Sequence, residues 1–242
     1  MPAEALRKEP NGRPRQRTGH DASKVTRMIN IRALAAALAA LLSLFAGTAS
    51  AGQTNVAVAD NFKEPAKEIA ALFERKTGHN AVLTFGASGS LFAQIIYEAP
   101  FQVFLSADQS RPKSVIEGGY AVPGTRFTYA IGKLVLWSKV VDVTKGDVVL
   151  KAGAFSSLAM ANPSIAPYGA AATEAMKALG FYDSLKLKIA RRKTVGQVYQ
   201  FVDEKKADVG LVALSNLFGV SAGTRWLVPQ GLYAQFDRTP CF

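Results

Sequence analysis

The chain has 242 residues, of which 49% are apolar, a formal net charge of +11, one cysteine and two histidines. This apolar content is enough for a folded core and excludes a chain that is disordered throughout. Disulfide frameworks, zinc clusters and a serine–histidine–aspartate triad are disfavoured, because the residues that they need are scarce.

Residues 1–51 are predicted to form a cleavable signal peptide. Basic residues as far as Arg32 precede a short apolar segment, and small residues at 49–51 form a cleavage site before Gly52. A membrane-spanning helix is the alternative, which the short apolar segment disfavours. Secretion is therefore expected.

The first part of this leader, residues 1–27, reads as an over-extended start or an unusually long basic region, and Met28 is the expected true start. Residues 1–51 hold eight basic and three acidic side chains, so removing them lowers the net charge from +11 to +6. The densest remaining basic run, at 190–193, lacks interleaved aromatic residues and indicates a solvated edge, not a nucleic-acid surface.

Short apolar strands alternate with helical patterns from residue 54 onward, and this order is typical of α/β folds. The first series predicts a parallel sheet with helices on its faces. Its predicted strands are 54–59, 81–86 and 101–108; one helix carries Ala66 to Phe73 on one face and ends at Gly78, and a second carries Leu91, Ile95 and Ile96.

A second series of the same kind comes next, which predicts a second lobe. Its expected strands are 132–138, 158–163, 186–192 and 208–214, and its expected helices are 169–179 and 195–204, the latter with a buried stripe of Val195, Val198 and Val202. We therefore expect lobe 1 at 52–130, lobe 2 at 131–222 and a return to lobe 1 at 223–242.

Three strand-to-helix turns, at 59–65, 85–91 and 162–175, present small and hydroxyl residues where free backbone N–H groups favour anions. Purely structural readings remain open for each of them. Asn61 could cap a helix with Glu64 as its capping-box partner, Ser88 and Ser90 could be caps, Tyr168 could simply pack beside Pro167, and His79 could be a surface or capping residue.

The second turn, "FGASGSL", has neither the lysine of a phosphate-binding P-loop nor a dinucleotide-binding glycine pattern. The missing cation indicates a compact anion, held in a closed cleft by neutral hydrogen-bond donors. Selectivity would then come from the size of the cavity.

In chain order, a secretory leader, "VAVADNF", "FGASGSLFAQI", "VFLSAD", "GKLVLWS", "NPSIAPYGAAATEAMKALG", "TVGQVYQFV" and "ADVGLVALS" resemble the periplasmic molybdate-binding proteins of ABC transporters. The resemblance covers about residues 54–233. It implies a type II periplasmic-binding fold, with two α/β lobes that close on molybdate or tungstate. It also implies a periplasmic monomer that is not an enzyme, has no cofactor and delivers its ligand to a membrane permease.

Four positions of this sequence match the ligand positions of that family. The resemblance implies that Asn61, Ser88, Tyr168 and the backbone N–H of Val195 bind the molybdate oxyanion, and so its molybdenum. Ala213 stands where some members have a tyrosine. Asp60 also departs from the expected chemistry, because a carboxylate repels a dianion at short range. We expect its side chain to turn away or to accept backbone N–H groups.

Two other functions are weighed against this one. The same fold could bind another small oxyanion, such as sulfate or phosphate. A secreted hydrolase with Ser88 or Ser106 as its nucleophile is the alternative from another class, but no histidine is suitably placed and no G-x-S-x-G elbow is present.

The last eight residues, 235–242, do not resemble the family. One deleted nucleotide in a family-like coding sequence would produce "QFDRTPCF" and a stop, so this tail is expected to be out of frame. The truncation would remove a terminal helix and expose the apolar surface beneath it. Cys241 would then have no function.

Overall fold

The computed structural model describes residues 35–36, 51–234, 236–238 and 240–241. The chain divides into two compact units, residues 1–50 and 51–242, and the second unit holds the sheets. Residues 35 and 36 are helical, and the rest of the predicted signal peptide up to residue 50, including Met28, lies outside the described residues. Among the residues described, no helix has the length and apolarity needed to cross a membrane.

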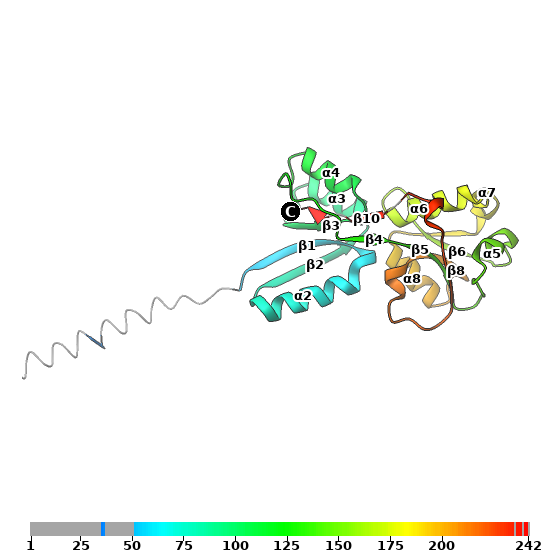
Figure 1. Ribbon diagram of the computed structural model, residues 1–242, viewed down its shortest axis with the longest axis horizontal. Coiled ribbons are helices and arrows are strands. Elements are labelled where there is room, and N and C mark those ends of the chain that lie inside the picture. The colour runs from blue at the N-terminus through cyan, green and yellow to red at the C-terminus, as the bar shows by residue number, and fades with distance from the viewer. Residues whose placement is uncertain (1–34, 37–50, 235, 239, 242) are drawn as a thin grey trace, which may run out of the picture. The chain divides into compact units, whose positions relative to one another are not determined.

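The first sheet is built on three parallel strands, as the alternating pattern predicts (Figure 1). The strand β1 (Gln53–Ala59) pairs in parallel with β2 (Asn80–Gly86) on one side and with β3 (Val103–Leu105) on the other. The third strand is shorter than predicted. A fourth strand, β11 (Pro240–Cys241), pairs with β3 in the antiparallel direction.

Helices cover both faces of this sheet, because successive side chains of β1 point to opposite sides. Val56 and Val58 pack with Ala66 of α2 (Lys63–Thr77) on one face. Ala57 packs on the other face with residues of α3 (Ser88–Ile96) and α4 (Ser110–Glu117). The helix α2 ends as predicted at Gly78, whose φ of 72° is left-handed. We call this group of elements the first lobe.

The second sheet has five strands in the order β7-β6-β8-β5-β9, and we call its group of elements the second lobe. Three strands are parallel, and β5 and β9 add an antiparallel edge. The strands are β5 (Leu134–Ser138), β6 (Leu158–Ala161), β7 (Ile189–Arg192), β8 (Val209–Ala213) and β9 (Thr224–Leu227); the helices are α5 (Gly146–Ala152), α6 (Pro167–Ala178), α7 (Tyr182–Leu185) and α8 (Val195–Asp203).

Short 3₁₀ helices occur at several connections. They are η1 (Asp60–Phe62), η2 (Lys186–Lys188), η3 (Leu214–Leu217) and η4 (Gln230–Leu232). The helix η1 connects β1 directly to α2, so it carries the first predicted binding turn. The helix η2 occupies the first three residues of the strand predicted at 186–192.

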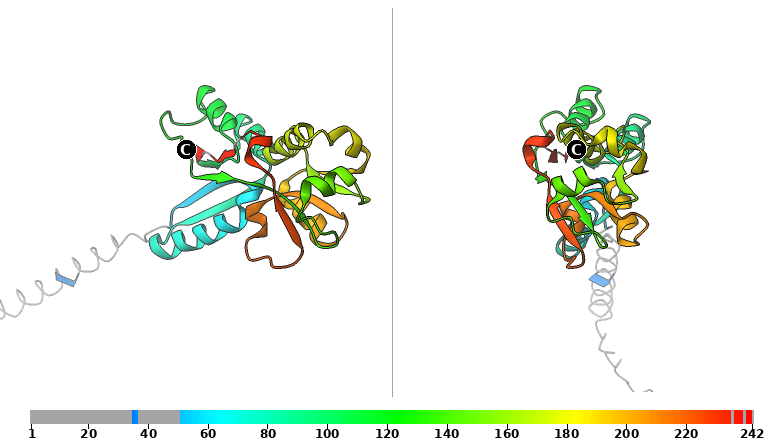
Figure 2. Two further views of the ribbon diagram at one scale, coloured as in Figure 1. Left: turned by 45° about the vertical axis from the view of Figure 1, so that its right-hand side comes forward. Right: turned by 90° about the vertical axis from the view of Figure 1, so that its right-hand side faces the viewer.

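Two strands join the lobes, β4 (Ala130–Gly132) on the outward path of the chain and β10 (Phe236–Arg238) on the return. They pair in the antiparallel direction, and Figure 2 shows the red C-terminal strands returning beside the first sheet. Residues 224–227 still belong to the second sheet, so the chain leaves that sheet later than the predicted boundary at 222. The boundaries of the lobes as independent domains stay predictions.

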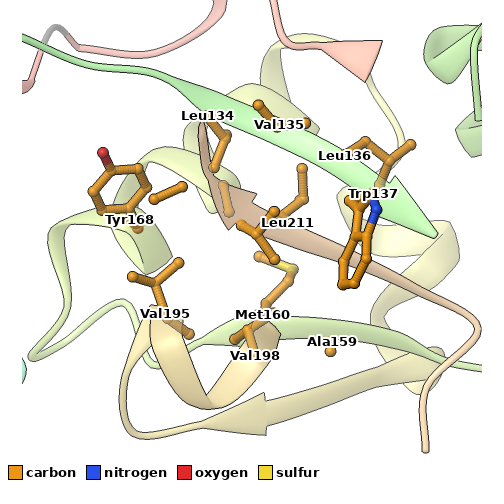
Figure 3. Packing of buried hydrophobic residues seen from close by; sticks show 14 of the residues in the cluster. Leu134, Val135, Leu136, Trp137, Ala159, Met160, Tyr168, Val195, Val198 and Leu211 are labelled. Carbon is orange, nitrogen blue, oxygen red and sulfur yellow. The ribbon is translucent and has the colours of Figure 1, made fainter. Parts of the chain in front are cut away.

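Among the described residues, the most extensive buried cluster lies mainly in the second lobe, between the sheet and helices α6 and α8, and it continues to Ala59, Ala87 and Ala107 of the first lobe. The predicted stripe of Val195, Val198 and Val202 is buried there, which confirms the helical pattern. Figure 3 shows Tyr168 and Val195 at one end of this core and Trp137 at the other. Tyr168 and Val195 therefore lie between this core and the turns that precede α6 and α8.

An apolar groove opens in the first lobe, between α2 and the sheet. It has a volume of about 330 Å³, and Ile69 on its wall is 57% exposed.

The predicted frame change in residues 235–242 concerns side chains that lie outside the described residues, so it stays a prediction.

Gly169→Ala is expected to destabilise the protein. Gly169 lies in the first turn of α6, where a Cβ would overlap the carbonyl oxygen of Ala161 and lie 2.8 Å from the carbonyl carbon of Asn162. Both obstacles are backbone, so α6 would have to shift, at a cost of about 1–3 kcal/mol. Urea unfolding measures this cost. Gly231→Ala, with open space around it, is the control and should change stability by less than about 0.5 kcal/mol.

Candidate functional site

Four helical segments begin around one small cavity, at the carboxyl ends of strands from both lobes. Its volume is about 10 Å³, which is close to the minimum that holds one water molecule, so it leaves room only for a compact ligand. All four predicted site residues line it: Asn61 and Ser88 from the first lobe, Tyr168 and Val195 from the second. The other lining residues are Ala59, Asp60, Gly86, Ala87, Ala107, Ala166, Pro167 and Thr194.

Asn61 is only 2% exposed, and its side-chain Nδ2 has no hydrogen-bond partner within the described structure. A buried donor without a partner costs about 1–3 kcal/mol, so such a group needs an explanation. The capping alternative does not supply one and is wrong, because Phe62 precedes α2 and no side chain caps that helix. Glu64, the expected capping partner, pairs instead with Lys67.

Ser88 is 1% exposed and opens α3. Its Oγ accepts a hydrogen bond of 3.0 Å from the backbone N–H of Ala107, which leaves the hydroxyl proton for another partner. The predicted cap at Ser90 is wrong. Its N–H donates to the carbonyl of Ala87, and α3 has no side-chain cap. Ser88 is therefore the serine of this turn that faces the cavity.

The second lobe contributes the first turns of α6 and α8. Val195 is the first residue of α8, so its N–H has no acceptor within the helix. Thr194 caps α8, with its Oγ1 accepting from the N–H of Gln197 at 3.1 Å. Tyr168 is 1% exposed and belongs to the hydrophobic core, so it packs as the structural alternative expects while also lining the cavity.

At least three hydrogen bonds between described residues join the lobes close to the cavity. The N–H of Gly89 donates to the carbonyl of Ile165 at 2.8 Å, and the hydroxyl of Ser215 donates to the carbonyl of Asn61 at 2.6 Å. The third runs from the hydroxyl of Thr194 to Oδ2 of Asp60. Asp60 thus accepts from a hydroxyl and not from backbone N–H groups, and the other branch of the expectation, that its side chain turns away from the anion, stays a prediction. The lobes meet around the cavity.

Thr194 is the residue that the sequence reasoning missed. A threonine directly before a predicted helix start is the signal that could have identified it as a cap, but nothing in the sequence places it opposite Asp60. Ala213 is buried in β8 and is not among the residues that line the cavity.

The surroundings of the two serines do not support nucleophilic catalysis. His79, the histidine within the described residues, accepts from the N–H of Gly52 far from both serines in the fold and is exposed. Ser106 Oγ accepts from the N–H of Asp108 at 3.3 Å. No lysine, arginine or histidine lines the cavity, and the described residues contain no cluster of three or more potential metal ligands among His, Cys, Asp and Glu.

Comparison with known proteins identifies the family. Residues 54–239 match the family described as bacterial extracellular solute-binding protein. The chain belongs to this family. Members of a solute-binding family carry ligands and do not transform them, so the prediction that the chain is not an enzyme is confirmed. Individual proteins also match this chain over most of its length.

The molybdate-binding protein ModA of Rhodobacter capsulatus is 52% identical over 206 residues, which cover 84% of this chain and 80% of the relative. ModA of Azotobacter vinelandii is 44% identical over 78% of this chain and 77% of the relative. The solved structure of the Azotobacter vinelandii periplasmic molybdate-binding protein matches with a TM-score of 0.74 and 37% identity, over 78% and 84% of the two chains. The predicted α/β periplasmic-binding fold is confirmed.

Proposed function

We propose that this solute-binding protein captures molybdate or tungstate in the periplasm and delivers it to the membrane permease of an ABC transporter. The observation that carries the proposal is Asn61, a buried amide donor without a partner among the described residues, which lines the small cavity between the lobes. An oxyanion supplies the acceptor that this amide lacks. The names of the relatives at 52% and 44% identity support the choice of molybdate.

The proposed ligand set is Asn61, Ser88, Tyr168 and the N–H of Val195. Asn61 and Ser88 offer side-chain donors, and Val195 offers a backbone donor at the positive end of α8. Neutral donors in a closed cavity hold a dianion well, because little water competes for it there. Molybdate and tungstate have nearly the same size, so they should bind alike, and the smaller sulfate should bind far more weakly.

Because the donors come from both lobes, we also propose that the lobes close on the ligand by a hinge motion. Contacts from both sides are available only in the closed form, so the ligand shifts the population toward it. We also propose that the protein is a monomer and that its leader is cleaved after Ala51.

Thermal unfolding with added oxyanions tests the function. Molybdate and tungstate should each raise the melting temperature by a similar amount, because a ligand that binds only the folded state stabilises it. Sulfate and phosphate should have much smaller effects at equal concentration. Tighter binding of sulfate or phosphate in calorimetry would favour the alternative small-oxyanion function.

Ser88→Ala should weaken both binding and stability. The substitution removes a donor to the anion and leaves the buried N–H of Ala107 without its acceptor. We expect a loss of about 1–3 kcal/mol in the free energy of unfolding and at least about a tenfold rise in Kd for molybdate. Chemical denaturation and calorimetry measure these changes. Ser90→Ala is the matched control, and an equal effect there would contradict the role of Ser88.

A further inference from the structure

Asp60 is the charged residue among those that line the anion cavity. It lies in η1, next to Asn61, and its carboxylate extends toward the second lobe. Its Oδ2 accepts from the hydroxyl of Thr194 at 2.5 Å, and a Cβ added to Gly196 would overlap the same oxygen. The carboxylate is therefore held against the first turn of α8, beside Val195.

The negative charge of Asp60 has no cationic partner among the described residues, where no lysine or arginine forms an ion pair with it. Lys63 lies in the adjoining outer pocket, which Asp60 also lines, and its Nζ is placed over the ring of Phe85 at 5.6 Å. A hydroxyl and the end of α8 hold the carboxylate in place, and neither cancels its full charge.

We propose that Asp60 sets the charge preference of the cavity, by opposing dianions more strongly than monoanions of the same shape. This inference rests on the proposed oxyanion function. Asp60 does not hold the ligand; it lowers the affinity of the site below what the neutral donors alone would give. A solute-binding protein must also release its ligand, and a fixed negative charge beside the anion aids release.

The expected size comes from Coulomb's law. At a separation of about 4–6 Å, two like unit charges weaken binding about three- to fivefold even at the dielectric constant of water. For a dianion the repulsion energy doubles. The factor by which binding weakens is therefore the square of the factor for a monoanion, about ten- to thirtyfold. The ratio of the affinities for a dianion and a monoanion therefore reports the charge effect, because a loss of structure would not change that ratio.

The test compares tungstate with perrhenate, a tetrahedral oxyanion of similar size that carries one negative charge instead of two. Asp60→Asn keeps the shape of the side chain and its acceptor for Thr194. Calorimetry at constant pH and ionic strength should show Kd falling about ten- to thirtyfold for tungstate and about three- to fivefold for perrhenate. Asp60→Ser, a shorter neutral variant, should move the ratio of the two Kd values in the same direction.

Glu64→Gln is the matched control, because Glu64 lines the outer pocket and not the cavity. It should leave the ratio nearly unchanged. If the wild type binds tungstate and both Asp60 variants leave the tungstate-to-perrhenate ratio unchanged, this inference is wrong while the proposed function stands. If neither the wild type nor the variants bind tungstate, both are overturned.

Discussion

Replacing Asn61 by leucine is expected to stabilise the ligand-free protein and to abolish most of its affinity for molybdate. The two effects have opposite signs because Nδ2 is buried without a partner among the described residues when no ligand is present. Leucine has nearly the same shape and carries no donor, so it removes the cost of an unsatisfied amide. The gain should be about 1 kcal/mol, or about 2–4 °C in melting temperature.

With molybdate present, the same change removes a charge-assisted hydrogen bond and leaves one oxygen of the anion against an apolar side chain. Such bonds contribute about 1.5–3 kcal/mol, so Kd should rise about 10- to 150-fold. Thermal unfolding with and without molybdate measures both effects in one experiment. The variant should start at a higher melting temperature and show little further shift.

Asn80→Leu is the control for Asn61, because Asn80 is exposed at the start of β2. It should change neither the ligand-free melting temperature nor the shift by a measurable amount. A clearly destabilised Asn61→Leu variant that keeps its full molybdate shift would show that the amide has a structural partner and no ligand role.

Gly89→Ala is expected to prevent full closure of the lobes while leaving each lobe folded. Gly89 lies in the first turn of α3, and its N–H donates to the carbonyl of Ile165 in the second lobe. An added Cβ would lie 2.8 Å from that oxygen and 3.0 Å from the Cα of Ile165. Both are backbone atoms, so the lobes must separate by several tenths of an ångström, which weakens this contact.

A cavity that depends on donors from both lobes loses affinity when the lobes separate. The substitution weakens one hydrogen bond and overpacks the contact between the lobes, and both effects cost binding free energy. We therefore expect Kd for molybdate to rise at least about tenfold. The urea-unfolding free energy of the ligand-free protein should fall by less than about 1 kcal/mol, since alanine favours the helix. Calorimetry and small-angle scattering with molybdate measure affinity and closure.

Ser90→Ala, one residue further along α3, serves as the control for Gly89→Ala and should bind and close normally. A Gly89→Ala protein that binds molybdate as tightly as the wild type would contradict the close approach of the lobes at this point. The comparison separates closure from the folding of α3.

Much of this fold arises from local patterns that the sequence displays. The strands β1, β2 and β8 and the buried stripe of α8 appear close to where alternation and helical spacing predict them. Gly78 ends α2 because the left-handed conformation favours glycine. The three small-residue turns meet at one cavity because parallel strands bring their carboxyl ends to one edge of a sheet.

Other features depend on contacts between distant residues, and they escaped prediction. Asn61 lines the cavity as the sequence predicts, but the 3₁₀ turn before α2, which displaces it from the capping position and buries its amide, was not predicted. The bond between Asp60 and Thr194 joins residues 134 positions apart, so no local pattern reveals it. The strand β9 joins the second sheet through pairing with β5, which short-range periodicity cannot assign.

The most direct measurement is a crystal structure of the protein with tungstate, with anomalous scattering recorded at a tungsten absorption edge. We predict one strong anomalous peak inside the cavity, with an oxygen of the anion about 3 Å from Asn61 Nδ2 and another within the same distance of Ser88 Oγ. The backbone nitrogen of Val195 and the side chain of Tyr168 should lie around the same ion. A peak confined to the outer pocket, or no peak with tungstate in excess, would contradict the proposed site.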